Sequence, residues 1–113
     1  MFGTLNGLQV YACSEPTDMR KGYNGLFTLA RDSLGRDPLS GDLFLFVSRN
    51  RKRAKVLFYD GTGLCILMKR LEQGRFVAPW ERETLEMSQS ELQLFLEGST
   101  HVRLRLSPEQ FMP

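Results

Sequence analysis

The fold is decided by residues 42–71, which read DLFLFVSRNRKRAKVLFYDGTGLCILMKRL. The apolar run at its start is strand-sized, and the lack of alternation is typical of a strand covered on both faces. The polar segment 49–53 and the Asp-Gly-Thr-Gly of 60–63 are turn signals. The stretch therefore predicts a meander of three antiparallel strands, over residues 42–48, 54–59 and 64–71.

Two helices are expected to flank this meander. Apolar residues recur at helical spacing over 19–34, and Thr17 or Asp18 can cap the first turn. A capping-box pattern at 88–91 precedes a shorter apolar stripe that ends at Gly98. We expect the 19–34 helix to pack on one face of the sheet.

The remaining segments contribute short strands. Residues 9–13 predict a strand that Pro16 stops, 75–77 a shorter one, and the tail alternates over 102–106. Together the elements predict a single α+β domain over residues 1–113. Its architecture is an antiparallel β-meander with one longer helix packed on the sheet and one short C-terminal helix.

Composition is that of an ordinary globular protein: 113 residues, 42% hydrophobic and 25% charged. No apolar run approaches the roughly 20 residues of a membrane helix, and no secretory signal is visible. We therefore expect a cytoplasmic protein without membrane attachment. Cys13 and Cys65 are too few for a disulfide scaffold and are expected to be inert core thiols, and the lone His101 predicts no zinc site.

Three apolar side chains represent the predicted core: Phe27, Leu45 and Phe58. Phe27 lies on the stripe of the 19–34 helix, so Phe27→Ala is expected to cost about 3–5 kcal/mol. Most other aromatic side chains are expected to pack in the core rather than stack on bases. Trp80 is the exception, expected to be exposed or interfacial.

The net charge of +2 is unevenly distributed. Residues 20–75 carry twelve Lys or Arg against five acids, a sum of +7, whereas residues 76–113 carry six glutamates against three arginines, a sum of −3. The basic middle of the chain suits a polyanion, and the acidic C-terminal part suits a basic protein partner.

The first turn of the meander carries the densest positive charge. Five cations, without an acid, occur within seven residues: Arg49, Arg51, Lys52, Arg53 and Lys55. We predict that the first four are mostly exposed and that this hairpin is the chief polyanion-binding surface. The alternative is a solvated turn that protects a sheet edge.

Two further groups of cations extend the candidate nucleic-acid surface. Arg20 and Lys21 lie at the predicted helix start, where amides favour a phosphate, although they could also be solvated or paired with acids. Lys69, Arg70 and Arg75 follow along the third strand. They either continue the basic face or form ion pairs such as that of Arg70 with Glu72.

Asp18, Asp60 and Glu72 are the candidates for a catalytic metal site, because two-metal nucleases need converging carboxylates. Asp18 suits a helix cap, Asp60 opens a tight turn, and Glu72 lies among cations. The sequence therefore predicts no catalytic residue, no metal site and no cofactor.

Three stretches carry a family resemblance when taken in order: VYACSEPTDMRKG at 10–22, KVLFYDGTG at 55–63, and KRLEQGRFVAP at 69–79. They resemble the accessory protein, often called TnpB, encoded by the second reading frame of insertion-sequence 66 elements. The resemblance covers about residues 8–98, and nothing is carried over to the divergent tail 99–113.

The resemblance implies a bacterial, cytoplasmic protein that works beside a separate transposase, which carries the chemistry. We expect a non-catalytic accessory protein of DNA transposition that contacts DNA with low specificity through the basic hairpin. Its protein partner is expected to be the transposase or a sibling accessory protein. The rival hypotheses are an interaction adaptor without DNA contact and a small metal-dependent nuclease. The sequence leaves self-association open.

Overall fold

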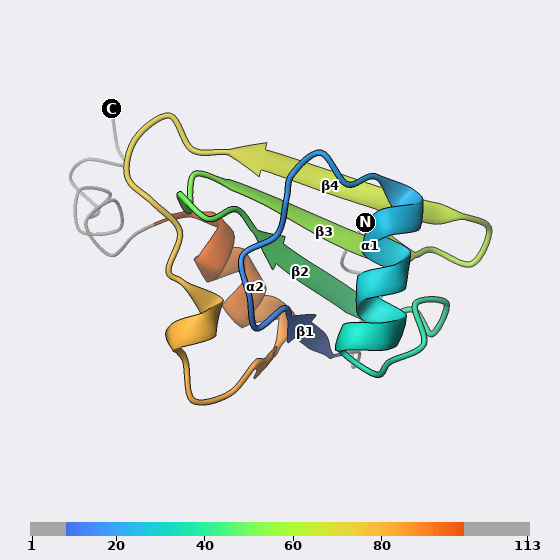
Figure 1. Cartoon of the computed structure of the whole chain (residues 1–113). Coiled ribbons are helices and arrows are strands. Elements are labelled where there is room, and N and C mark those ends of the chain that lie inside the picture. Colours follow the sequence, from blue (N-terminus) through green and yellow to red (C-terminus); the bar gives the residue numbers. More distant parts are fainter. Residues whose placement is uncertain (1–8, 99–113) are drawn as a thin grey trace, which may run out of the picture.

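The computed structural model describes residues 9–98, and Figure 1 shows its arrangement. The elements are, in chain order, β1 (Val10–Ala12), α1 (Tyr23–Thr28), the π-helical turn η2 (Leu29–Ser33), β2 (Leu43–Val47), β3 (Arg53–Tyr59), β4 (Leu64–Arg70), the 3-10 turn η3 (Pro79–Glu81), β5 (Glu86–Met87) and α2 (Gln89–Leu96).

The five strands form one sheet in the order β4-β3-β2-β1-β5. The antiparallel meander β2-β3-β4 confirms the predicted core of the fold, and with the two helices it confirms the α+β class. Two pairings were not predicted: β1 runs parallel to β2, and β5 pairs antiparallel with β1. The strand expected over 75–77 was wrong, because that segment forms no ladder.

One helix covers each face of the sheet (Figure 1). On the α1 face, Leu26 and Ala30 pack against Phe44, Phe46 and Leu57. On the α2 face, the apolar stripe of α2 packs against the alternate residues of the same strands, which include Leu45 and Phe58. All five residues of β2 are buried, as expected for a strand covered on both sides.

The first helix begins later than predicted, at Tyr23 rather than Met19, and Gly22 at its N-cap makes no side-chain cap bond. The preceding segment is held against the end of β2, because Cys13 N donates to the Leu45 carbonyl and Thr17 N to the Val47 carbonyl. A segment bonded in this extended way cannot also be helical. The predicted caps Thr17 and Asp18 were therefore wrong.

The predicted core holds for two of its three residues. Leu45 and Phe58 are buried, but Phe27 is only half-buried, with the Arg31 guanidinium 5.9 Å from its ring centroid. Leu26, one position earlier, occupies the buried place. Because only part of Phe27 leaves water on folding, the loss expected for Phe27→Ala falls below 3 kcal/mol.

The second helix confirms its sequence signature. The Ser88 side chain accepts from Glu91 N, and the Glu91 carboxylate accepts from Ser88 N, which completes the capping box. Cys13 is buried as expected, but Cys65 is half-buried. Trp80, expected to be exposed or interfacial, is half-buried and packs against the α2-side core, so it is not exposed. His101 and the strand pattern over 102–106 lie outside the described residues.

The turn between β3 and β4 offers a pH-dependent test. The Asp60 carboxylate accepts from the backbone of Thr62 and Gly63, and these bonds lower its pKa from 3.8 to about 2. A carboxylate whose pKa is lowered by folding stabilises the fold at pH values above its pKa in the unfolded state. This stabilisation is lost as the pH falls through the pKa of the folded state. We expect Asp60→Asn to be less stable than wild type at pH 7, with the difference shrinking between about pH 4 and pH 2. Urea unfolding at several pH values measures this; a pH-independent difference would contradict it.

Candidate nucleic-acid interface

The hairpin between β2 and β3 is closed by a compact hydrogen-bonded turn. Ser48 N donates to the Arg53 carbonyl and Arg51 N to the Ser48 carbonyl, both at 2.9 Å. The Ser48 hydroxyl donates to the Asn50 side-chain oxygen at 2.8 Å, and the same oxygen accepts from Lys52 N. Arg51 adopts a φ of 61°, the left-handed conformation that such loops require.

The tip of this hairpin is covered by the chain that follows β4. Leu71 N donates to the Lys52 carbonyl at 2.8 Å, and Phe76 N donates to the Arg51 carbonyl at 2.7 Å. Arg51 and Lys52 are half-buried in consequence, whereas Arg49 and Arg53 are exposed. The prediction that all four are mostly exposed was therefore wrong for Arg51 and Lys52. No local pattern in the sequence indicates that the segment after β4 folds over the turn.

Lys55 has a structural role that the sequence did not indicate. Its ammonium group donates to the carbonyls of Met19 and Lys21, both at 2.8 Å. Two of its three donors are thus engaged, and the side chain is half-buried. The contact fastens the segment before α1 to the sheet and brings the backbone of Arg20 and Lys21 beside β3.

Arg20 is paired within its own segment. Its guanidinium binds the Asp18 carboxylate at 2.7 Å, and these hydrogen bonds hold the pKa of Asp18 well below its usual range. Lys21 is exposed. Asp18 therefore orders the segment through Arg20, rather than by capping the helix.

Arg53 and Arg70 are directly opposite one another in the register of β3 and β4. Like charges in this position destabilise a sheet. Arg70 is relieved by Glu72, 3.0 Å away, which confirms the predicted ion pair. Arg53 is exposed, and among residues 9–98 no acidic side chain forms an ion pair with it.

The other two predicted cations are placed differently. Lys69 is opposite Ala54, one position along from Arg70, so it lies on the α2 face. Arg75 is exposed in the loop after β4. The structure therefore does not gather all ten predicted residues on one surface. We define the basic face by four of them: Arg20, Lys21, Arg53 and Arg70.

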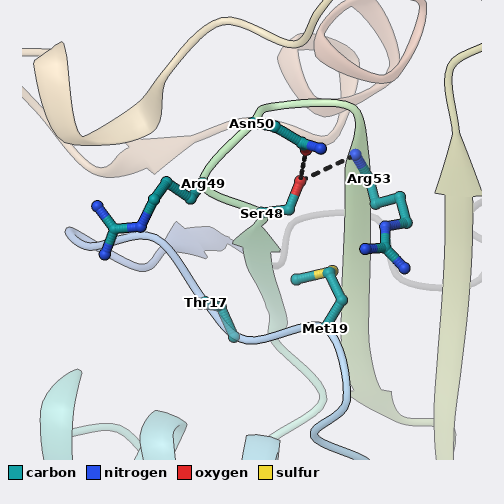
Figure 2. A pocket seen from close by; sticks show the side chains of 6 residues that line it. All are labelled: Thr17, Met19, Ser48, Arg49, Asn50 and Arg53. Atoms are coloured by element: carbon teal, nitrogen blue, oxygen red, sulfur yellow. Dashed lines mark hydrogen bonds between the residues drawn. The ribbon is translucent and has the colours of Figure 1, made fainter.

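A pocket of about 320 Å³ lies between the segment before α1 and the hairpin turn. Figure 2 shows its lining, which comprises Thr17, Met19, Ser48, Arg49, Asn50 and Arg53. The side chains of Arg49 and Arg53 leave the hairpin on opposite sides (Figure 2). Sequence reasoning missed Thr17, Ser48 and Asn50 as site residues, because only the packing of two distant segments makes this pocket.

Each of the three candidate carboxylates for a metal site has a local partner. Asp18 binds Arg20, Asp60 binds its own turn, and Glu72 binds Arg70. Over the described range 9–98, no group of three or more His, Cys, Asp or Glu side chains is placed to hold a metal ion. Within the same residues, no helix is long and apolar enough to cross a membrane.

Residues 8–105 of the chain match a protein-family model described as "IS66 Orf2 like protein". The uncharacterized protein y4jC of Sinorhizobium fredii is 34% identical over 109 residues, covering 96% of this chain and 93% of its own. The uncharacterized protein y4hO of the same organism is 37% identical over 99 residues, covering 87% and 86%. No solved structure matches.

Proposed function

The chain belongs to the IS66 Orf2-like family, the accessory proteins of one type of insertion sequence, and from this premise we propose that it assists transposition by contacting DNA through its basic face. The observation that carries the proposal is Arg53, exposed, without an acidic partner in the described chain, and directly opposite Arg70. Glu72 pairs with Arg70 but leaves Arg53 unpaired, and a phosphate backbone would supply the missing negative charge beside Arg53.

The proposed contact is with the DNA backbone. Exposed guanidinium and ammonium groups neutralise phosphates and release counterions, which gives affinity without sequence preference. The protein acts without catalysis of its own, in the cytoplasm and beside a separate transposase. The local pairing of Asp18, Asp60 and Glu72 supports the absence of catalysis, because each of these carboxylates has a partner of its own.

Salt-dependent binding tests the proposal. We expect Arg53→Ala/Arg70→Ala to weaken duplex binding and to flatten the dependence of log K on log salt by about two units, one for each phosphate contact removed. Fluorescence anisotropy at several salt concentrations measures both quantities.

The matched control is Lys69→Ala/Arg75→Ala, which removes the same charge but spares the basic face. It should retain the wild-type slope. Equal slopes for the two double variants would reject the basic face, and absence of binding by the wild type at low salt would reject DNA contact.

A second candidate function is an adaptor that binds protein without touching DNA. It is favoured by the edge strand β4, where Leu67 and Met68 are 36% and 60% exposed. Large exposed apolar side chains on an unpaired strand edge are features of protein-binding surfaces. A pull-down with the element's transposase separates the two functions. Recovery that survives nuclease and the Arg53→Ala/Arg70→Ala change would favour the adaptor.

A further inference from the structure

The pocket beside the hairpin turn presents hydrogen-bond donors rather than acceptors. The Ser48 hydroxyl already donates to Asn50 and accepts from Arg53 N, at 2.8 and 3.1 Å. The Asn50 oxygen accepts from both Ser48 and Lys52, which leaves the amide NH2 of Asn50 as the group it can offer. A ligand in this pocket would therefore meet donors, as an anion requires.

Thr17 has a buried hydroxyl without a hydrogen-bond partner at the wall of the same pocket. Its side chain lines the pocket and the residue is 6% exposed, yet its hydroxyl has no hydrogen-bond partner among the described residues. Buried hydroxyls are ordinarily bonded, so an exception needs an explanation. The backbone of Thr17 is fixed beside the pocket, because its N–H donates to the Val47 carbonyl at 2.8 Å.

Charge completes the site. Arg49 and Arg53 both line the pocket, although their guanidinium groups point apart in Figure 2, and none of its six lining residues is acidic. Its volume of about 320 Å³ leaves ample room for a phosphate group. Two guanidinium groups favour an anion with several oxygens, because each offers a fork of N–H donors.

We propose that this pocket binds one phosphate group of a nucleic-acid backbone. Arg49 and Arg53 are exposed, and their side chains turn toward the pocket to donate to the phosphate oxygens. The Asn50 amide and the Thr17 hydroxyl complete the set. The Thr17 hydroxyl reaches the ligand by rotation about its χ1 bond, for which threonine has more than one accessible rotamer. This inference rests on the proposed function and deepens it, since it places one phosphate at a defined site.

Thr17→Val tests the site because it removes the hydroxyl and keeps the shape. We expect duplex affinity at fixed low salt to fall about tenfold, the effect of one hydrogen bond to a charged group. The melting temperature should stay equal or rise, because an unsatisfied buried hydroxyl disappears. Thr28→Val, the same change at an exposed position of α1, should leave affinity unchanged, and Thr17→Ser should restore it.

Titration with inorganic phosphate, followed by the backbone amide NMR shifts of residues 17 and 48–53, gives an independent readout. We expect saturable shifts in the wild type that Thr17→Val weakens. If the protein binds duplex DNA but Thr17→Val alters neither measurement, the pocket is wrong and the proposed function stands. If phosphate binds in a Thr17-dependent way while DNA does not bind, the pocket is an anion site, but its nucleic-acid ligand and the proposed function are wrong.

Discussion

Replacing Phe76 with alanine is expected to lower the free energy of unfolding by about 3–5 kcal/mol. The ring is fully buried on the α2 side of the sheet and stacks on Phe95, with ring centroids 5.4 Å apart. Alanine would lose the transfer free energy of the ring and the aromatic contact, and would leave a cavity between α2 and the sheet. The loss is a large part of the roughly 5–15 kcal/mol that stabilises a typical domain.

The matched control is the neighbouring Val77→Ala. Val77 is 44% exposed, so its truncation should change stability by no more than about 0.5 kcal/mol. Urea unfolding of both variants measures the difference. Similar losses for the two would show that the loop after β4 is not anchored through Phe76.

The burial of Phe76 also determines how the hairpin between β2 and β3 is covered. Its backbone N–H donates to the Arg51 carbonyl, so the buried ring holds the segment that covers the turn. The same packing explains why Arg51 and Lys52 are half-buried while Arg49 and Arg53 remain exposed. The core of the α2 face therefore determines which cations of the hairpin can reach a ligand.

The elements predicted correctly from the sequence are those with a local signal. The meander follows from apolar runs separated by turn residues, and the start of α2 follows from the capping box of Ser88 and Glu91. The Arg70–Glu72 ion pair likewise joins residues two positions apart. In each case the interacting groups lie close in the chain, so propensity and spacing suffice.

The features that were missed depend on contacts between distant segments. The parallel pairing of β1 with β2, the short β5 and the late start of α1 all follow from how 10–17 runs along the sheet. The pocket has the same origin, because Thr17 meets Ser48 and Arg53 only when this segment crosses the end of β2. No periodicity in the sequence encodes such a crossing.

Lys55 was predicted as a nucleic-acid contact, but its hydrogen bonds give it a structural role in the fold. Its ammonium group bonds to the carbonyls of Met19 and Lys21, residues 36 and 34 positions away. One wall of the pocket is the segment with Met19, and the other includes Arg53 on β3. The hydrogen bonds of Lys55 hold the first wall against β3. Lys55 therefore connects the stability of the sheet to the geometry of the basic face.

Lys55→Met is expected to lower the free energy of unfolding by about 1.5–3 kcal/mol, because it keeps the aliphatic stem but leaves both carbonyls without their charged donor. Lys69→Met, the same change at an exposed position of β4, should alter stability by no more than about 0.5 kcal/mol. Urea unfolding provides the comparison, and hydrogen exchange of the amides of residues 17–22 should accelerate in Lys55→Met alone.

If Lys55 instead served chiefly as a phosphate contact, its replacement would leave stability and exchange unchanged and flatten the salt slope of DNA binding by about one unit. Stability and the salt slope together decide whether Lys55 stabilises the segment before α1 or contacts the DNA backbone.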